Sequence, residues 1–153
     1  MGEDFDEYLM YGGRVRCNVA DDGTINAFYG ETGYADDGSN GQVMIYQPKF
    51  YYQRNITNST KLAKGSAIYQ EEIILSSKPA YGFKLHPLFD AGDGEEYDYV
   101  LLSAYEGTIN NNKLCSVSGE QPISNITIAQ AETAAKARGT GWHIMNMKAI
   151  SAN

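Results

Sequence analysis

The sequence predicts a β-rich α+β fold, mainly strands with one clear helix. Twelve tyrosines, against five phenylalanines and one tryptophan, favour strands, because tyrosine packs its ring while its hydroxyl stays in water. Sixteen glycines, together with frequent Asn and Asp, supply turns between short strands. With 153 residues, 42% of them hydrophobic and 20% charged, the chain can bury the core of one domain or of two small ones.

The first part of the chain predicts short strands separated by turns. Residues 1–13 are acidic and then glycine-rich, so we expect an arm or linker there. Polar and apolar side chains alternate over residues 14–19, which is typical of a strand. The run Asp21-Asp22-Gly23-Thr24 predicts a turn, and residues 25–29 form the expected returning strand.

A long hairpin is expected next. Residues 42–53 predict a strand in which Pro48, lacking an N–H to donate, marks an edge or a bulge. Residues 67–76 predict the second strand, and the polar residues 55–65 connect the two. Residues 97–105 predict a further strand with apolar side chains on both faces, which favours a central position in a sheet.

The clearest helix signal lies near the end of the sequence. Thr127 and Gln130 have the spacing of a capping box, and residues 128–138 are strong helix formers. The side chains expected to face inward are Ile128, Ala131, Ala134 and Ala135. Residues 139–145 predict a turn into a short apolar strand, and residues 147–153 the beginning of another helix. Because the sequence stops inside this segment, we expect it to be part of a longer protein.

Charge and hydropathy disfavour two classes of partner. The net charge of −7 and the pI of about 4.7 oppose binding to a nucleic-acid backbone. No apolar run reaches the length that spans a bilayer, and the N-terminus lacks the pattern of a signal peptide, so no membrane insertion is expected. Cys17 and Cys115 favour two buried free thiols, with a disulfide between them as the alternative.

No catalytic set is evident in the sequence. The chain has two histidines, His86 and His143, and lacks the nucleophile-elbow, zinc-protease, P-loop and dinucleotide-binding motifs. Nucleophilic catalysis would need the fold to bring a serine or cysteine to one of these histidines. We therefore expect no catalytic residues, no cofactor and no enzymatic activity.

Two acidic, glycine-containing segments have the oxygen-rich side chains that calcium prefers. The candidate metal ligands are Asp36, Asp37, Asn40, Asp90 and Asp93. The twelve-residue EF-hand pattern is absent, and tight turns explain the same residues. We expect turns rather than a metal site.

Exposed tyrosines are the candidates for ligand binding, because tyrosine-rich surfaces are common in recognition sites. The residues concerned are Tyr29, Tyr34, Tyr51 and Tyr105. Trp142 has two interpretations, as a core residue or as a platform on which a sugar stacks, and a core position is favoured.

Several segments resemble, in the same order, parts of phage and prophage tail proteins. The resemblance covers roughly residues 14 to 153 and rests on residues 16–30, 36–44, 48–52, 82–89, 99–107 and 138–145. The last part also resembles the opening of a C-type-lectin-like domain, as used by phage tropism determinants and other variable receptor-binding proteins. There, a strand, a first helix, a GWH-like strand and a second helix follow one another, as residues 99–105, 127–138, 141–145 and 147 onward do here.

The resemblance implies a domain organisation and a function. Residues 14–96 would form a β-rich attachment domain, and residues 97–153 the N-terminal part of a truncated C-type-lectin-like domain. The protein would be a bacteriophage virion component at a tail tip, tail fibre or head fibre, assembled in the host cytoplasm and displayed on the particle surface. It would attach to the host, with bacterial glycan as ligand and other virion proteins as partners, as a homo-oligomer such as a trimer. The alternative is a purely structural virion or adaptor protein that packs against capsid or tail subunits and binds no receptor.

Overall fold

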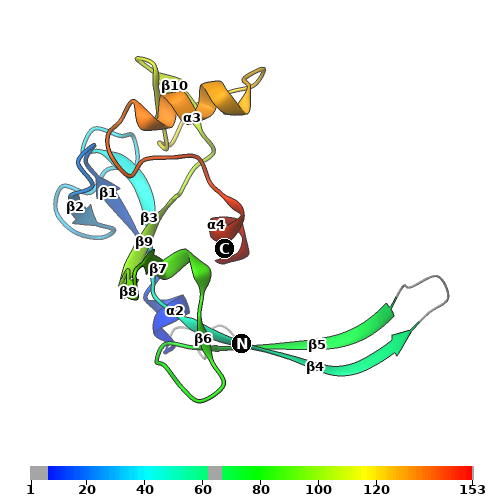
Figure 1. Cartoon of the computed structure of the whole chain (residues 1–153). Coiled ribbons are helices and arrows are strands. Elements are labelled where there is room, and N and C mark those ends of the chain that lie inside the picture. Colours follow the sequence, from blue (N-terminus) through cyan, green and yellow to red (C-terminus); the bar gives the residue numbers. More distant parts are fainter. Residues whose placement is uncertain (1–6, 62–66, 153) are drawn as a thin grey trace.

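The computed structural model describes residues 7–61 and 67–152, and most of its regular structure is strand (Figure 1). The β-rich α+β class predicted from the sequence is confirmed. None of the described helices is long and apolar enough to cross a membrane. In chain order the elements are α2 (Leu9–Gly12), β1 (Val15–Val19), β2 (Ile25–Phe28), β3 (Gln42–Pro48), β4 (Tyr51–Lys61), β5 (Ala67–Ser76), β6 (Lys84–Leu85), the 3-10 helix η2 (Pro87–Phe89), β7 (Asp90–Gly92), β8 (Glu95–Glu96), β9 (Tyr99–Ser103), β10 (Thr108–Asn110), β11 (Lys113–Cys115), α3 (Ile128–Lys136) and α4 (Met147–Ala152).

The main sheet is antiparallel and has the strand order β2-β1-β3-β9. The predicted strand at 97–105 is confirmed as β9, but the predicted central position is wrong, because among the described strands β9 pairs only with β3. Its two faces are apolar for another reason. Leu101 packs against a core cluster around Val19 on one side, and Val100 against a cluster around Phe89 on the other. Because each face of this edge strand packs against a different core, the strand has the apolar composition that is typical of a central strand.

The first core cluster, which we call the upper core, lies on the main sheet. Its buried members are Cys17, Val19 and Met44, and Trp142 packs against them. Both cysteines are free and buried, so the prediction of free thiols is confirmed. Burial raises the pKa of Cys17 to about 11, so this thiol stays protonated and behaves as a small apolar group.

The turn predicted at Asp21 to Thr24 is confirmed, and it joins β1 to β2. Val19 pairs with Ile25 across it. The Asp22 carboxylate accepts the Thr24 N–H at 2.9 Å, and Gly23 has a φ of +88°, which a residue without a side chain adopts at no steric cost. The turn also places Asp21 beside β11 and the end of α3.

The predicted hairpin is confirmed, but its first strand is displaced. The strand expected at 42–53 ends at Pro48, and a new strand, β4, begins at Tyr51. β4 extends through part of the predicted polar connection, whose residues 62–65 lie outside the described residues. β4 and β5 form a two-stranded antiparallel ribbon that projects from the body of the molecule (Figure 1). We refer to β4 and β5 together as the ribbon.

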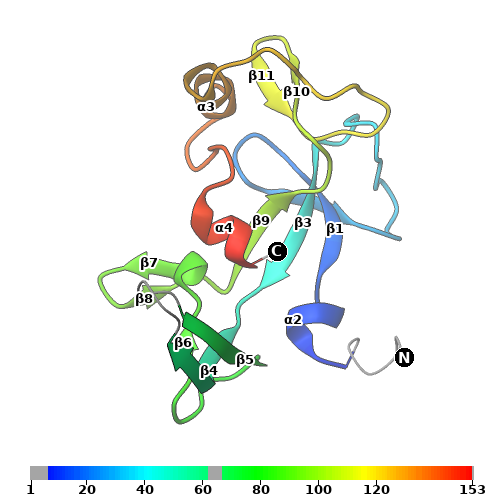
Figure 2. The same cartoon turned by 90° about the vertical axis from the view of Figure 1, so that its right-hand side faces the viewer.

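The second core cluster, the lower core, lies at the base of the ribbon. Met10, Phe50 and Phe89 are buried there, and Leu75 of β5 and Ala152 of α4 pack against them. Met10 belongs to α2, so this part of the expected arm or linker at 1–13 is packed against the body, while residues 1–6 lie outside the described residues. Figure 2 shows α4 beside β9, above the base of the ribbon. The lower core therefore connects α2 and α4 to the ribbon.

The C-terminal segment contains both predicted helices. The capping box of α3 is confirmed, because Thr127 Oγ1 accepts the Gln130 N–H and the Gln130 side chain accepts the Thr127 N–H. The prediction that Ile128 faces inward is wrong: α3 packs on β11, and its buried residues are Ala134 and Ala135. The short strand expected within 139–145 does not form in the described residues.

The domain boundary that the resemblance implies, between residues 96 and 97, separates β3 from β9. These two strands are neighbours in one sheet.

Candidate functional site

The loop between β2 and β3 is fixed to the main sheet by the side chain of Asn18. This residue is fully buried on β1. Its Nδ2 donates to the Ala35 carbonyl at 2.7 Å, and its Oδ1 accepts the Ala35 N–H at 2.8 Å. Because a buried amide that loses its partners is costly, these two bonds hold Ala35 in place. They also fix its neighbours in the sequence, Tyr34 and Asp36.

Three of the four candidate tyrosines meet at this loop. The rings of Tyr29 and Tyr34 pack edge to face, with centroids 5.3 Å apart. The hydroxyls of Tyr34 and Tyr105 both donate to Asp36 Oδ1, at 2.6 and 3.2 Å. Tyr29 is 64% exposed, so its ring faces solvent. With Arg16, these residues form what we call the tyrosine cluster: Arg16, Tyr29, Tyr34, Asp36 and Tyr105.

Arg16 provides the positive charge of the tyrosine cluster. Its guanidinium lies 3.7 Å from Asp36 Oδ1, donates to the Tyr105 hydroxyl at 3.2 Å, and sits 5.3 Å from the centroid of the Tyr105 ring. Burial, followed by the hydrogen bond to Asp36, raises the pKa of Tyr34 to about 12. The Tyr34 hydroxyl therefore remains a donor at neutral pH, and the Asp36 carboxylate is held in one orientation.

This arrangement suits a ligand that has both apolar faces and hydroxyl groups. An exposed tyrosine ring offers an apolar platform with a polar tip. The guanidinium and carboxylate beside it supply fixed donors and acceptors, and both are partly open to solvent. A sugar has these two features, with C–H groups on one face and hydroxyls at its edge.

The fourth candidate, Tyr51, lies elsewhere. It is buried on β4 at the base of the ribbon, and its hydroxyl donates to Glu96 at 2.8 Å. Lys49 binds the same carboxylate at 3.0 Å. The hydrogen bond to Tyr51 and the contact with Lys49 lower the pKa of Glu96. Tyr51 thus anchors the β7–β8 segment to the ribbon instead of facing a ligand.

The candidate metal ligands are engaged in turns and loop contacts. In the described residues, no three His, Cys, Asp or Glu side chains gather where they could hold a metal ion. Asp37 accepts the Ser39 N–H and Asp90 accepts the Gly92 N–H, both at 2.9 Å, as in an Asx turn. Asn40 Nδ2 donates to the Gly33 carbonyl at 2.9 Å, and Asp93 has a positive φ of 54°.

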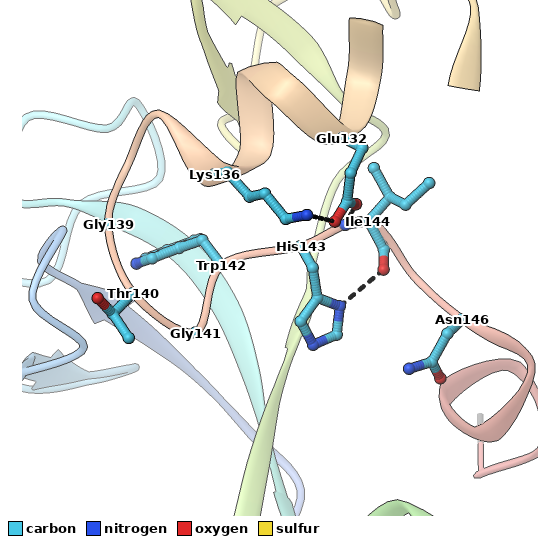
Figure 3. A pocket seen from close by; sticks show the side chains of 9 residues that line it. All are labelled: Glu132, Lys136, Gly139, Thr140, Gly141, Trp142, His143, Ile144 and Asn146. Atoms are coloured by element: carbon cyan, nitrogen blue, oxygen red, sulfur yellow. Dashed lines mark hydrogen bonds and ion pairs between the residues drawn. The ribbon is translucent and has the colours of Figure 1, made fainter. Parts of the chain in front are cut away.

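An open depression of about 820 Å³ lies between the end of α3 and the segment that follows it (Figure 3). Trp142 is at its edge, but the indole N–H donates to the Asp21 carbonyl at 2.8 Å and the ring packs on the upper core. Glu132 accepts the Ile144 N–H at 3.1 Å and pairs with Lys136 at 2.9 Å. These contacts give the core interpretation of Trp142 the better support, and the polar groups nearby fix the chain after α3.

A narrower groove of about 420 Å³ lies beside the lower core, and it contains a His–Ser pair. His86 Nδ1 accepts the Leu88 N–H at 3.3 Å, so in the neutral ring Nε2 carries the proton and faces Ser151 Oγ at 3.2 Å. Ser151 Oγ in turn donates to the Lys148 carbonyl at 2.9 Å. A base that activates a serine needs a free lone pair toward the hydroxyl, and this tautomer has none there. Burial lowers the pKa of His86, which favours the neutral ring.

The chain matches no protein-family model, no curated protein and no solved structure. The interpretation of the tyrosine cluster therefore rests on its own residues. The sequence analysis missed one member of the cluster, Arg16, and the residue that fixes its loop, Asn18, because both were only part of a predicted strand. Their spacing of two residues on β1 was the available signal, because it places two polar side chains on one face of an inner strand.

Proposed function

We propose that this chain is a non-enzymatic attachment module of a bacteriophage particle and that its tyrosine cluster binds a glycan of the bacterial surface. The observation that carries the proposal is the convergence of Tyr29, Tyr34 and Tyr105 on Asp36 and Arg16. The cluster is partly open to solvent, carries one positive and one negative group beside an exposed aromatic ring, and is fixed from behind by the hydrogen bonds of the buried Asn18 side chain. Binding in this proposal requires neither a metal nor a cofactor.

The proposed location is the surface of a virion, at a tail tip, tail fibre or head fibre. It follows from the resemblance to phage tail proteins over residues 14 to 153. We also propose that residues 97–153 are the N-terminal part of a C-type-lectin-like domain. The order of β9, α3 and α4 supports this assignment, and the segment at 141–145 lies between the two helices without forming a strand. In such a particle many copies act together, so weak individual sites give strong attachment.

The test is binding of the purified chain to an array of bacterial capsular and lipopolysaccharide glycans. The Tyr29→Ala variant, which lacks the exposed aromatic ring, is expected to bind glycan roughly ten- to thirtyfold more weakly, as is usual when an aromatic hot spot is lost. Tyr81→Ala is the matched control, because Tyr81 is fully exposed on a turn outside the cluster and its loss should leave binding unchanged. Equal binding by the two variants and the wild-type chain would contradict the proposal.

A purely structural virion or adaptor protein is the second candidate function. Exposed apolar side chains on the ribbon and the C-terminal helices favour it, since such surfaces are usually covered by a partner. They include Ile56, Ile73, Ile128, Met147 and Ile150. A wild-type chain that binds no glycan on the array but joins purified phage structural proteins would favour this function over the first.

A further inference from the structure

Among the described residues, no third strand pairs with the outer part of the ribbon. β6 pairs with β4 only at Tyr51 and Tyr52, and farther out β4 and β5 have only each other in the described part of the chain. The ribbon projects away from both cores (Figure 1). A two-stranded hairpin alone is marginally stable in water and normally needs a covering layer. The fold therefore leaves a surface that a partner would stabilise.

Over residues 51–56 and 70–76, the part of the ribbon whose side chains the structure describes, one face is more apolar and has the more exposed isoleucines. Residues paired across an antiparallel ladder share a face, and alternate residues follow along each strand. Ile56 and Ile73 lie on one face, and they are 58% and 61% exposed. The opposite face has Ile74, 37% exposed, across from Gln53. We call the first face the ribbon face; its members are Tyr52, Arg54, Ile56, Glu71, Ile73 and Leu75.

The ribbon face continues into the groove beside the lower core. Tyr52, Ile73 and Leu75 line that groove together with Met10 and Phe50. The apolar side chains of the ribbon face therefore continue from Ile73 through Leu75 and Tyr52 to the lower core. A partner lying on the ribbon could place side chains in the groove as well.

The charges of the ribbon face are self-complementary. Arg54 and Glu71 pair between the two isoleucines, with Arg54 Nη2 3.0 Å from Glu71 Oε2. A two-fold axis through this face would set Arg54 of each copy against Glu71 of the other, because such an interface joins identical patches. A face with one positive and one negative group beside apolar residues thus fits a second copy of itself.

The overall charge also favours contact between ribbons over contact between bodies. Residues 51–76 carry three basic and two acidic side chains, a net charge of +1. The other residues carry nine basic and seventeen acidic side chains, a net charge of −8. Two bodies repel one another, whereas two ribbons can meet with little repulsion.

We propose that the ribbon is a self-association element, and that its Ile56–Ile73 face packs against the same face of a second copy of this chain. Each copy covers the partner's isoleucines and exchanges Arg54–Glu71 contacts with it. The face is small compared with a standard interface, so the isolated dimer should be weak, with a Kd on the order of 10 µM. The proposal is independent of the tyrosine cluster, and its test contains no glycan.

Sedimentation velocity of the chain from about 5 to 500 µM tests the proposal, since mass action shifts a weak dimer over this range. The wild-type chain is expected to rise from monomer to dimer mass. Ile73→Lys should raise the Kd by on the order of 100-fold, because each substitution removes a buried isoleucine twice in a two-fold interface. Ile74→Lys adds the same charge to the opposite face of the same strand and should leave the Kd nearly unchanged. Circular dichroism checks that both variants keep the wild-type spectrum.

Charge-reversal variants distinguish association with a second copy of this chain from association with another partner. Arg54→Glu gives the ribbon face two acidic groups, and Glu71→Arg gives it two basic groups. Like charges then repel across the two-fold interface, so each variant alone should remain monomeric. Mixing the two should restore a dimer with one copy of each. A wild-type chain that stays monomeric throughout the concentration range overturns the proposal. Equal weakening of dimerisation by Ile73→Lys and Ile74→Lys also overturns it, and so does a mixture of the two charge-reversal variants that does not associate.

Discussion

Phe89→Ala is expected to lower the free energy of unfolding by about 3–5 kcal/mol, the usual loss for truncating a buried phenylalanine. Phe89 has no exposed surface, and its ring packs edge to face on Phe50 at 5.3 Å. The loss is a large part of the roughly 5–15 kcal/mol that stabilises a typical domain. Urea denaturation followed by circular dichroism measures it.

The effect should spread from the lower core to the ribbon. Leu75 of β5 and Ala152 of α4 both pack on the cluster that contains Phe89. A cavity there loosens the base of the ribbon, so Phe89→Ala should also weaken self-association under native conditions. Phe89→Leu keeps much of the side-chain volume and should cost less than half as much, whereas Tyr81→Ala should change stability by less than about 0.5 kcal/mol. A loss below about 1 kcal/mol for Phe89→Ala would contradict the assigned role of the lower core.

Local sequence signals predicted the elements well where the chain's own neighbours decide the conformation. The Asp21–Thr24 turn and the capping box at Thr127 are examples, because each depends on residues within a few positions of one another. The hairpin was predicted for the same reason. The end of β3 at Pro48 was missed because proline permits an edge, a bulge or a strand end, and only the pairing partners decide among them.

Signals that depend on distant packing were misleading. The apolar faces of β9 predicted a central strand, but Val100 and Leu101 belong to two different cores. Ile128 fits the apolar stripe of α3, yet it is exposed because α3 packs on β11 through Ala134 and Ala135. Periodicity gives the direction of a side chain on its own element and does not say whether another element lies there.

The sequence predicted that tyrosines would form the candidate binding site, but it did not predict which tyrosines would come together. Tyr29, Tyr34 and Tyr105 were candidates because tyrosine suits recognition surfaces. Nothing in the sequence distinguishes them from Tyr51, which is buried at the base of the ribbon. Tyr34 and Tyr105 are 71 positions apart, and their meeting at Asp36 depends on the pairing of β9 with β3.

Arg138→Ala is expected to lower the free energy of unfolding by about 2–4 kcal/mol, because it removes a nearly buried cation from a group of partners. The Arg138 side chain is 7% exposed. It donates to Asp21 Oδ1 at 2.5 Å and to the Leu114 carbonyl, and it lies 5.5 Å from the centroid of the Trp142 ring. These contacts join the β1–β2 turn, the β10–β11 hairpin and the segment after α3. Lys136→Ala, at the last residue of α3, is the control, because its solvent-screened pair with Glu132 should contribute much less to stability.

The pH dependence of stability gives a second measure of this contact. The hydrogen bond from Lys113, followed by that from Arg138, holds the pKa of Asp21 below its usual value. A carboxylate with a lowered pKa in the folded state contributes its full stabilisation above the pKa of the unfolded chain, about 3.9, and loses it as the pH falls further. Asp21→Asn should therefore differ from the wild-type chain by a constant free energy between about pH 5 and pH 7, and the difference should shrink below about pH 4. A difference that stays constant down to about pH 2.5 would mean that the charge of Asp21 does not hold these three segments together.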